Sequence, residues 1–183
     1  MASLTRTSTY SFTVPTLETK RLVMRGWREE DAEPLAKIYS DEDVTRFIGG
    51  VRSGPESWRT MCQRIGQWHV RGYAMFAVDE KVSGAFIGYC GPHFPAGWPE
   101  PEIGWTFARE HWGKGYATEA ARASLIYAYT ELGWSTAISL IDKDNSASER
   151  VATKLGATYE STREVTDFTA RIFRHLPPDQ FLH

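Results

Sequence analysis

Cysteine is scarce in this chain, since Cys62 and Cys90 are the only two among its 183 residues. They lie far apart in the sequence, form no Cys-x-x-Cys pair and have no His at metal-ligand spacing. A disulfide framework and a zinc site are therefore not expected. We predict that both cysteines are reduced, semi-buried packing residues, and that the protein uses no metal.

The chain also lacks an excess of basic charge. Its 21 Lys and Arg against 23 Asp and Glu give a formal net charge of −2, with a pI near 6.2. No global field then attracts nucleic acid or anionic lipid, so we predict neither as a partner. No apolar run approaches the roughly 20 residues that span a membrane, and none near the start has the length of a signal peptide. We therefore expect a cytoplasmic protein.

What is present suits one globular domain. The mass is 20.7 kDa, and 42% of the residues are hydrophobic and 13% aromatic. A fold of this size buries about 70% of the surface that its unfolded chain exposes. We predict a single domain over residues 17–183, preceded by a flexible segment over residues 1–16 that is rich in Ser and Thr.

Strand and helix patterns alternate along this domain without internal repeats. The N-terminal half predicts a strand over 21–27, a helix after Glu29 and a second helix from Ser53, whose apolar stripe we expect in the core. That stripe comprises Trp58, Met61, Cys62, Ile65, Trp68 and His69. Residues 73–78 and 84–90 then predict an antiparallel hairpin.

A proline-rich stretch, 91–101, separates this hairpin from the rest of the chain. Its four prolines and two glycines predict a stiff loop. Beyond it we expect a helix from Tyr116 to a stop at Gly133 and a shorter one over 145–155, with Ser146 and Glu149 at capping-box spacing. Strands are predicted over 102–109, 135–141, 157–163 and 168–175. The order is mixed α/β.

The most informative segment joins a predicted strand to a predicted helix through Trp112-Gly113-Lys114-Gly115-Tyr116-Ala117. Glycines at such a turn let backbone N–H groups converge without obstruction by Cβ atoms, and the start of a helix adds positive potential. The turn therefore suits a phosphate or pyrophosphate, with Lys114 at its rim. The alternative is a tight turn that needs glycine only for its dihedral angles.

Two familiar phosphate motifs do not fit this turn. A P-loop requires Ser or Thr after its Gly-Lys pair, whereas Gly115 follows Lys114, and the earlier glycine is missing. A dinucleotide fingerprint needs glycine where Thr118 stands, and an acidic residue where Leu140 and Ile141 stand. The antiparallel hairpin before the turn also argues against a Rossmann sheet and a nucleotide-dependent oxidoreductase.

The turn resembles the pyrophosphate loop of the Gcn5-related N-acetyltransferases, the GNAT superfamily, which follows the pattern [Gln/Arg]-x-x-Gly-x-[Gly/Ala]. Trp112 departs from the first position, but W-G-x-G-Y-A-T-E-A is common in the branch resembling ribosomal-protein N-terminal acetyltransferases. A second match runs from Asn145-Ser146-Ala147-Ser148 through Val151-Ala152 to Leu155-Gly156-Ala157. A third is the opening strand, Thr19 to Arg25. The resemblance extends from about Leu17 to His175.

This resemblance implies an α+β fold with a mixed, mostly antiparallel sheet of seven strands and about four flanking helices. It also implies acetyl-CoA as co-substrate, lying where the strand of 103–107 splays from that of 135–141, with its pyrophosphate on the amides of 113–118. The cofactor-binding residues implied are Ile103, Trp105, Phe107, Trp112, Gly113, Lys114, Gly115, Tyr116, Ala117, Thr118, Asn145 and Ser148. Arg150 and Lys154 are candidates for the 3′-phosphate.

Acetyl transfer to an amine needs a base, a donor for the thioester oxygen and an acid for the thiolate. The resemblance gives Glu102 as the base, with a solvated strand-end carboxylate as the alternative, and a backbone N–H of the splayed strand as the donor. Many members place a Tyr acid where this chain has Ala152. Ser148 is then either the acid or a hydrogen-bond donor to sulfur. Ser148 and Asn145 both have helix capping as the alternative.

The proline-rich loop predicts the acceptor side, because loops that carry aromatic residues often line binding sites. We expect four residues to shape the acceptor pocket: Tyr89, His93, Phe94 and Trp98. The sequence thus predicts an acetyl-CoA-dependent N-acetyltransferase whose acceptor is a primary amine, on a protein N-terminus or a small molecule. A non-catalytic acyl-CoA-binding or interaction module is the alternative, which Ala152 favours slightly. A homodimer is compatible with the sequence.

Overall fold

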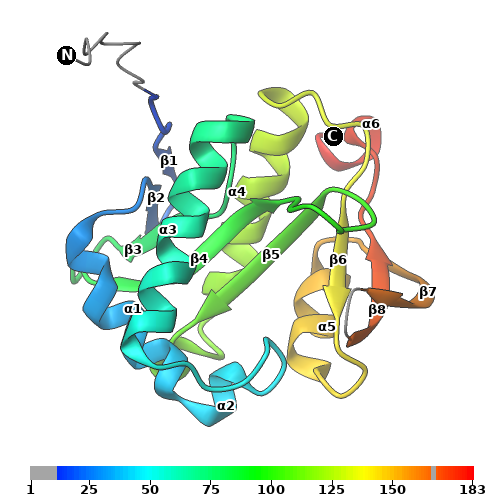
Figure 1. The fold of residues 1–183 in the computed structure, drawn as a ribbon. Coiled ribbons are helices and arrows are strands. Elements are labelled where there is room, and N and C mark those ends of the chain that lie inside the picture. Colours follow the sequence, from blue (N-terminus) through cyan, green and yellow to red (C-terminus); the bar gives the residue numbers. More distant parts are fainter. Residues whose placement is uncertain (1–11, 166–167) are drawn as a thin grey trace, which may run out of the picture.

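Strand-forming segments from both halves of the chain join one sheet. The computed structural model describes residues 12–165 and 168–183, and its sheet has eight strands in the order β1-β2-β3-β4-β5-β6-β8-β7 (Figure 1). The strands are β1 (Leu17–Glu18), β2 (Leu22–Arg25), β3 (Phe76–Glu80), β4 (Phe86–His93), β5 (Glu102–Phe107), β6 (Ile138–Ile141), β7 (Thr158–Val165) and β8 (Phe168–Arg174). Neighbours pair antiparallel except β5 and β6, which are parallel. The mixed, mostly antiparallel α+β sheet is confirmed.

The sheet has one strand more than the seven predicted. The additional strand, β1, pairs with β2 through two residue pairs. Two residues are too few to show an alternating pattern, so periodicity does not detect such a strand. Of the segment predicted to be flexible, residues 1–11 lie outside the described residues, and residues 12–16 have no regular secondary structure.

Helices cover both faces of this sheet (Figure 1). The elements are η1 (Glu29–Asp31), α1 (Ala32–Ser40), α2 (Glu42–Thr45), α3 (Gly54–Arg71), η2 (Arg109–His111), α4 (Tyr116–Thr130), α5 (Ser146–Lys154) and α6 (Pro178–Phe181). On one face Tyr39 of α1 and Met61 of α3 pack with Tyr89 of β4. On the other face Ala120 of α4 packs in a larger cluster with Ile103 of β5. The single-turn helices α2 and α6 were not predicted, whereas α1, α3, α4 and α5 were.

α3 begins as its sequence predicts, but its buried stripe is narrower than expected. Ser53 and Glu56 form a capping box, and Gly72 ends the helix with φ +76°. Met61 and Trp68 are buried, whereas Trp58 is 45% exposed and Cys62 is also exposed. The prediction of a semi-buried Cys62 is therefore wrong. α3 packs on one layer only, so residues on the flank of its apolar stripe face solvent.

β4 extends further than the sequence predicted, which corrects the loop over 91–101. Gly91, Pro92 and His93 continue the ladder with β5. Proline lacks an N–H and is tolerated where no neighbouring strand needs one. Pro92 meets this condition, because β3 begins at Phe76, opposite Cys90, and has no partner for position 92. The consequence for the site is that His93 lies directly opposite Glu102.

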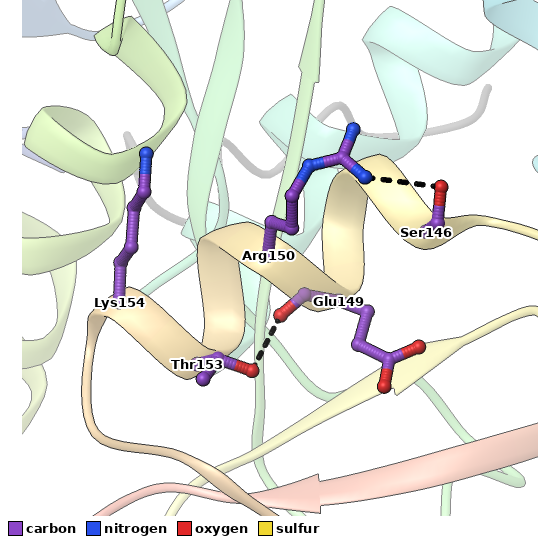
Figure 2. A pocket seen from close by; sticks show the side chains of 5 residues that line it. All are labelled: Ser146, Glu149, Arg150, Thr153 and Lys154. Carbon is purple, nitrogen blue, oxygen red and sulfur yellow. Dashed lines mark hydrogen bonds between the residues drawn. The ribbon is translucent and has the colours of Figure 1, made fainter.

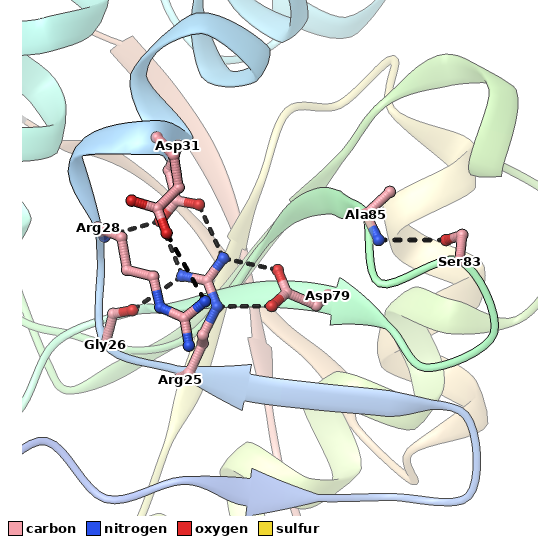
Figure 3. A network of polar contacts seen from close by, with 8 residues as sticks. Arg25, Gly26, Arg28, Asp31, Asp79, Ser83 and Ala85 are labelled. Carbon is pink, nitrogen blue, oxygen red and sulfur yellow. Dashed lines mark hydrogen bonds and ion pairs between the residues drawn. The ribbon is translucent and has the colours of Figure 1, made fainter.

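A buried ionic network fixes the entry to α1 against β2 and β3 (Figure 3). The guanidinium of Arg25 donates to both carboxylate oxygens of Asp31 at 2.8 Å and to both of Asp79 at 2.5 and 2.8 Å. Burial opposes its charge, but the bonds to the two aspartates hold the pKa of Arg25 above its usual value. Such a network costs desolvation and requires every partner, so it specifies one arrangement of β2, β3 and η1.

No helix within residues 12–165 and 168–183 has the length and apolarity needed to cross a bilayer. The same residues contain no group of three or more His, Cys, Asp or Glu side chains suited to a metal ion. Both cysteines are free, and burial raises the pKa of the Cys90 thiol to about 12, so this thiol is protonated at neutral pH.

Candidate active site

β5 and β6 are hydrogen-bonded at one point and diverge beyond it. Their parallel ladder has a single residue pair, Glu102 with Ile138, where Ile138 N donates to Pro101 O at 2.9 Å. In a regular parallel ladder the next N–H on β6, that of Leu140, would donate to Ile103 O. Leu140 N instead donates to the Glu102 carboxylate at 3.1 Å. The sheet therefore opens immediately after Glu102.

Glu102 occupies this opening as a buried carboxyl group, not as the solvated strand-end carboxylate considered from the sequence. Only 7% of its surface is exposed. Its Oε2 accepts from Trp98 Nε1 at 2.6 Å and its Oε1 accepts from Leu140 N. Burial raises the pKa of Glu102 to about 7, although these two hydrogen bonds favour the charged form. A carboxyl group with such a pKa can accept a proton near neutral pH.

The main chain of β5 presents alternate residues to the opening. Ala108 N donates to Ile87 O, and hydrogen-bonded and non-hydrogen-bonded pairs alternate along an antiparallel ladder. The N–H and C=O groups of Ile103, Trp105 and Phe107 therefore face β6. The side chains of Ile103 and Phe107 are buried in the α4-side core, and Trp105 packs against that core and a smaller cluster near β6. Any ligand contact from Ile103 or Phe107 would thus come from the backbone.

The glycine turn ends in a helix start that no side chain caps. Gly113 and Gly115 have φ values of +72° and +82°, and Gly115 is the N-cap of α4. The first-turn N–H groups of Tyr116, Ala117 and Thr118 have no partner within the helix, since Glu119 N is the first that bonds back to Gly115 O. The residues fit an anion, because free donors, positive φ and missing Cβ atoms coincide.

Trp112 and Arg21 hold this turn from both sides. Trp112 Nε1 donates to Phe107 O at 2.8 Å while 47% of the residue stays exposed. Arg21 donates to Lys114 O at 2.8 Å and to Glu119 at 2.6 Å, with its guanidinium 4.5 Å from the Tyr116 ring centre. The side chain of Lys114 is exposed at the rim. The sequence did not predict that Arg21 supports the glycine turn, because this residue lies in the opening strand motif and nothing in the sequence links it to the turn.

Asn145 caps α5, as the alternative reading of this residue proposed. Its side chain accepts from Ser148 N at 3.0 Å, and the expected capping box between Ser146 and Glu149 does not form. Glu149 instead pairs with Arg171 of β8 at 2.7 Å. The half-buried hydroxyl of Ser148 has no hydrogen-bond partner among the described residues, so it is available to a ligand. No hydrogen bond in this part of the chain joins Ser148 to Glu102.

A shallow depression of about 440 Å³ lies along α5 (Figure 2). Its five lining residues are Ser146, Glu149, Arg150, Thr153 and Lys154. Figure 2 shows Arg150 and Lys154 rising from one side of the helix, with Glu149 and Thr153 on the other. Within the described chain neither cation forms an ion pair, so this side of α5 carries two unneutralised positive charges beside α4.

Three of the four predicted acceptor residues lie on the α1 and α3 side of the sheet, and two of them, His93 and Trp98, lie beside Glu102. His93 pairs with Glu102 across the ladder, and its ring meets Trp98 edge to face at 5.2 Å. Tyr89 follows on the same face, where its hydroxyl bonds to that of Tyr39 at 2.8 Å. Burial lowers the pKa of His93 to about 4, with a further contribution from Arg64.

Phe94 lies apart from these residues, because its ring faces Arg71 at the end of α3 at 5.2 Å. In its place the structure brings in Phe168 of β8, whose ring lies 6.2 Å from that of Trp98. Sequence reasoning also missed Arg64, Ser139 and His175. The only signal for Ser139 was a polar residue within an apolar strand, and for Arg64 there was none.

Comparison with known proteins agrees with this architecture. The family model described as "Acetyltransferase (GNAT) domain" matches residues 21–158. The YkkB protein of Bacillus subtilis is 36% identical over 151 residues, which are 80% of this chain and 87% of YkkB. An Agrobacterium tumefaciens acetyltransferase structure superposes with TM-score 0.82 at 28% identity, covering 93% of this chain and 99% of that one.

Ribosomal-protein acetyltransferases share the fold at lower identity. Mycobacterium smegmatis RimJ, solved in complex with CoA-disulfide, superposes with TM-score 0.72 at 18% identity. The superposition covers 94% of this chain and 90% of the RimJ chain. This likeness concerns the fold alone. The family match, which spans most of the described chain, carries the assignment: the chain belongs to the GNAT family, whose members use acyl-CoA, and is a GNAT-type N-acetyltransferase.

Proposed function

We propose that this enzyme transfers an acetyl group from acetyl-CoA directly to a primary amine, with Glu102 as the general base. The observation that carries the proposal is a buried carboxyl group, with a pKa of about 7, where β5 and β6 diverge. We also infer that residues 17–183 act as one acetyltransferase domain. Acetyl-CoA supplies the activated acyl group, and the protein supplies position, charge stabilisation and proton transfer.

The uncapped start of α4 supports acetyl-CoA as the ligand. Its free N–H groups suit the pyrophosphate, and the side of α5 that carries Arg150 and Lys154 suits the 3′-phosphate. RimJ, which shares the fold, was solved with a CoA derivative. Asn145 and the Ser148 hydroxyl, which has no partner among the described residues, would face the pantetheine arm, with Ser148 donating to sulfur.

The chemical roles follow from which groups are free at the opening. Glu102 can take a proton from the acceptor ammonium, which makes the amine nucleophilic. The N–H of Trp105 faces the opening without a strand partner and can donate to the thioester oxygen, where negative charge develops. A serine hydroxyl is a weak acid, so we assign Ser148 a hydrogen bond to the departing sulfur and not full protonation.

Thermal unfolding with different ligands tests this proposal. Acetyl-CoA at a hundredfold its Kd should add about 2.7 kcal/mol of stability, or roughly 5 to 11 °C in Tm. Acetyl-dephospho-CoA should stabilise less, and NAD should not stabilise. Stabilisation by acetyl-CoA without transfer to any amine in a broad screen would instead support a non-catalytic acyl-CoA-binding module. No response to acetyl-CoA would contradict both.

Arg64, an arginine on the acceptor side that pairs with no described carboxylate, indicates which class of amine the enzyme acetylates. The guanidinium of Arg64 lies 4.0 Å from the Tyr89 ring centre and donates to the Tyr39 hydroxyl at 3.1 Å. It forms no ion pair with any described carboxylate, and its buried Nε has no hydrogen-bond partner in the same part of the chain. A partly buried cation without a counter-charge favours an anionic ligand. We propose that the acceptor carries a carboxylate that pairs with Arg64.

The register sets the spacing of this acceptor. Tyr89, under Arg64, and His93, opposite Glu102, are four residues apart on one strand face, which corresponds to about 13 Å. Between them lies the pair Gly91 and Gly104, which contributes no side chains of its own, and the Met75 side chain packs against Gly104. The amine and the carboxylate should therefore be separated by several bonds, as in a short peptide, and not share one carbon as in a free α-amino acid.

A tripeptide and its C-terminal amide form the matched pair of acceptors for this prediction. The free acid should show a kcat/KM about tenfold higher or more than the amide, since a charge-assisted hydrogen bond is worth on the order of 1.5 to 3 kcal/mol. Arg64→Gln should remove this preference by raising KM for the acid alone. Equal use of the two peptides by the unchanged enzyme would contradict a carboxylate subsite at Arg64.

A further inference from the structure

Two side chains replace main-chain hydrogen bonds where β5 and β6 part. Ser139 Oγ donates to Ile103 O at 2.7 Å, and Leu140 N donates to Glu102 Oε1 at 3.1 Å. In a regular parallel ladder Leu140 N would bond Ile103 O directly. With these side-chain partners the Leu140 N–H and the Ile103 carbonyl are both hydrogen-bonded, but not to each other, so the ladder ends at Glu102.

Ser139 is itself held by a buried histidine that follows β8. His175 is 2% exposed, and its Nε2 lies 2.9 Å from Ser139 Oγ. The single hydroxyl proton goes to Ile103 O, so His175 Nε2 must be the donor in this bond. Burial lowers the pKa of His175 to about 4, with a contribution from Arg174, so the ring is neutral near pH 7. Its Nδ1 has no partner among the described residues.

We propose that Ser139 and His175 are positioning residues for Glu102: Ser139, held by His175, occupies the Ile103 carbonyl, and this reserves the Leu140 N–H for the carboxylate and keeps β5 and β6 apart. This inference rests on the proposed role of Glu102 as base. Without the hydroxyl, the buried Ile103 carbonyl would lose its partner, and the nearest donor that a regular ladder offers it is Leu140 N–H. The strands would then close by one step, and Glu102 would lose a hydrogen bond that favours its charged form.

The groups that face Glu102 leave its titration easy to observe. From β4 comes His93, with a pKa lowered by burial to about 4, and His175 beyond β8, which contacts Ser139 and not Glu102, also has its pKa lowered to about 4. The loop contributes the Trp98 indole, which does not titrate, and β6 contributes a backbone N–H. Arg64 of α3 acts on His93 and stays charged throughout. Of these groups Glu102 alone changes charge between about pH 5 and 9.

Ser139→Ala tests the proposal through the pKa of Glu102, followed by ¹³C NMR of labelled glutamate side chains and by the pH profile of kcat/KM. Both should move upward by about one pH unit, because the carboxylate loses the Leu140 hydrogen bond. Ser139→Thr, which restores the hydroxyl, should return the pKa toward its original value. The control is Ser124→Ala, which removes another buried hydroxyl that bonds only within α4 and to Cys90. It should leave the Glu102 pKa unchanged.

A measurement on the unaltered protein covers the case in which Ser139→Ala does not fold. The Leu140 amide proton should titrate with the same pKa as the Glu102 side chain, because the two groups are hydrogen-bonded. Absence of that titration, or a Glu102 pKa in folded Ser139→Ala that equals the original, would overturn the proposal. A shifted pKa in a protein that acetylates no amine would support the positioning role and contradict the proposed function, so the two can fail separately.

Discussion

Glu102→Gln should lower kcat/KM for acetyl transfer by about 10²-fold or more while acetyl-CoA binding is retained. General-base catalysis typically contributes 10² to 10⁴ in rate, and the amide cannot accept the proton. Among the described residues its carboxyl group bonds to Trp98 and Leu140 and not to the glycine turn or α5, so the cofactor contacts proposed there should persist. Steady-state kinetics with a fixed amine and calorimetry with acetyl-CoA measure the two quantities separately.

The pH profile distinguishes this loss from a general loss of structure. In the unaltered enzyme the rate should fall as pH drops through about 7, where Glu102 becomes protonated. That limb should be missing from the residual activity of the variant. Glu110→Gln is the matched control, because Glu110 is an exposed carboxylate on η2 and should leave both rate and profile unchanged. A profile of Glu102→Gln that keeps its limb near pH 7 would remove Glu102 from the role of base.

The burial of Glu102 should also make the free energy of unfolding depend on pH. Because the folded pKa of Glu102 is raised, the folded state binds more protons than the unfolded state between about pH 4.5 and 7, and the free energy of unfolding falls as pH rises through this range. The full difference is on the order of 3 kcal/mol. His93 and His175 act in the opposite sense, since their folded pKa values are lowered. The comparison with Glu102→Gln therefore isolates the carboxyl group.

The sequence predicted the parts of this site that depend on local chain geometry. The glycine turn and the start of α4 are set by residues close together in the chain, so they could be predicted without a structure. The succession of seven of the eight strands along the chain and the position of Glu102 at a strand start could be predicted for the same reason. The cap at Asn145 was only the alternative interpretation of that residue, and the predicted capping box of Ser146 and Glu149 does not form.

What the sequence did not predict depends on which strands become neighbours. The pKa of Glu102 follows from burial against β6 and the loop, and Ser139 meets Ile103 only because β5 pairs with β6. Arg64 has the spacing of an ordinary exposed helix residue, and only the folded chain shows that it packs against Tyr89 and pairs with no carboxylate of the described residues. These features arise from long-range pairing, which periodicity within one segment cannot report.

Gly115→Asp should abolish most acetyl-CoA affinity without unfolding more easily than Gly115→Asn, and the comparison of these two variants, which share the strain of a side chain at this φ, isolates the charge. Gly115 has φ +82°, a conformation that Asp and Asn tolerate better than other non-glycine residues, and an added Cβ would meet only Arg21 Nη2 at 3.5 Å. The aspartate charge would interact favourably with the free N–H groups of α4 and with Arg21, so the unliganded Asp variant should unfold at or above the temperature of the Asn variant.

The affinity for acetyl-CoA should rank the two variants in the opposite order, with Gly115→Asp the weaker binder. A carboxylate at the N-cap competes with the pyrophosphate for the same N–H donors and repels it. We expect about 10- to 100-fold weaker binding to Gly115→Asp than to Gly115→Asn, or about 1.4 to 2.8 kcal/mol. The same pair at Gly133, just beyond the other end of α4 with φ +66° and open space around its Cβ position, should bind acetyl-CoA equally. Equal affinities at position 115 would show that the turn needs its glycines for backbone geometry alone. The predicted opposition between stability and affinity cannot arise from unfolding, so it identifies the turn as the anion site.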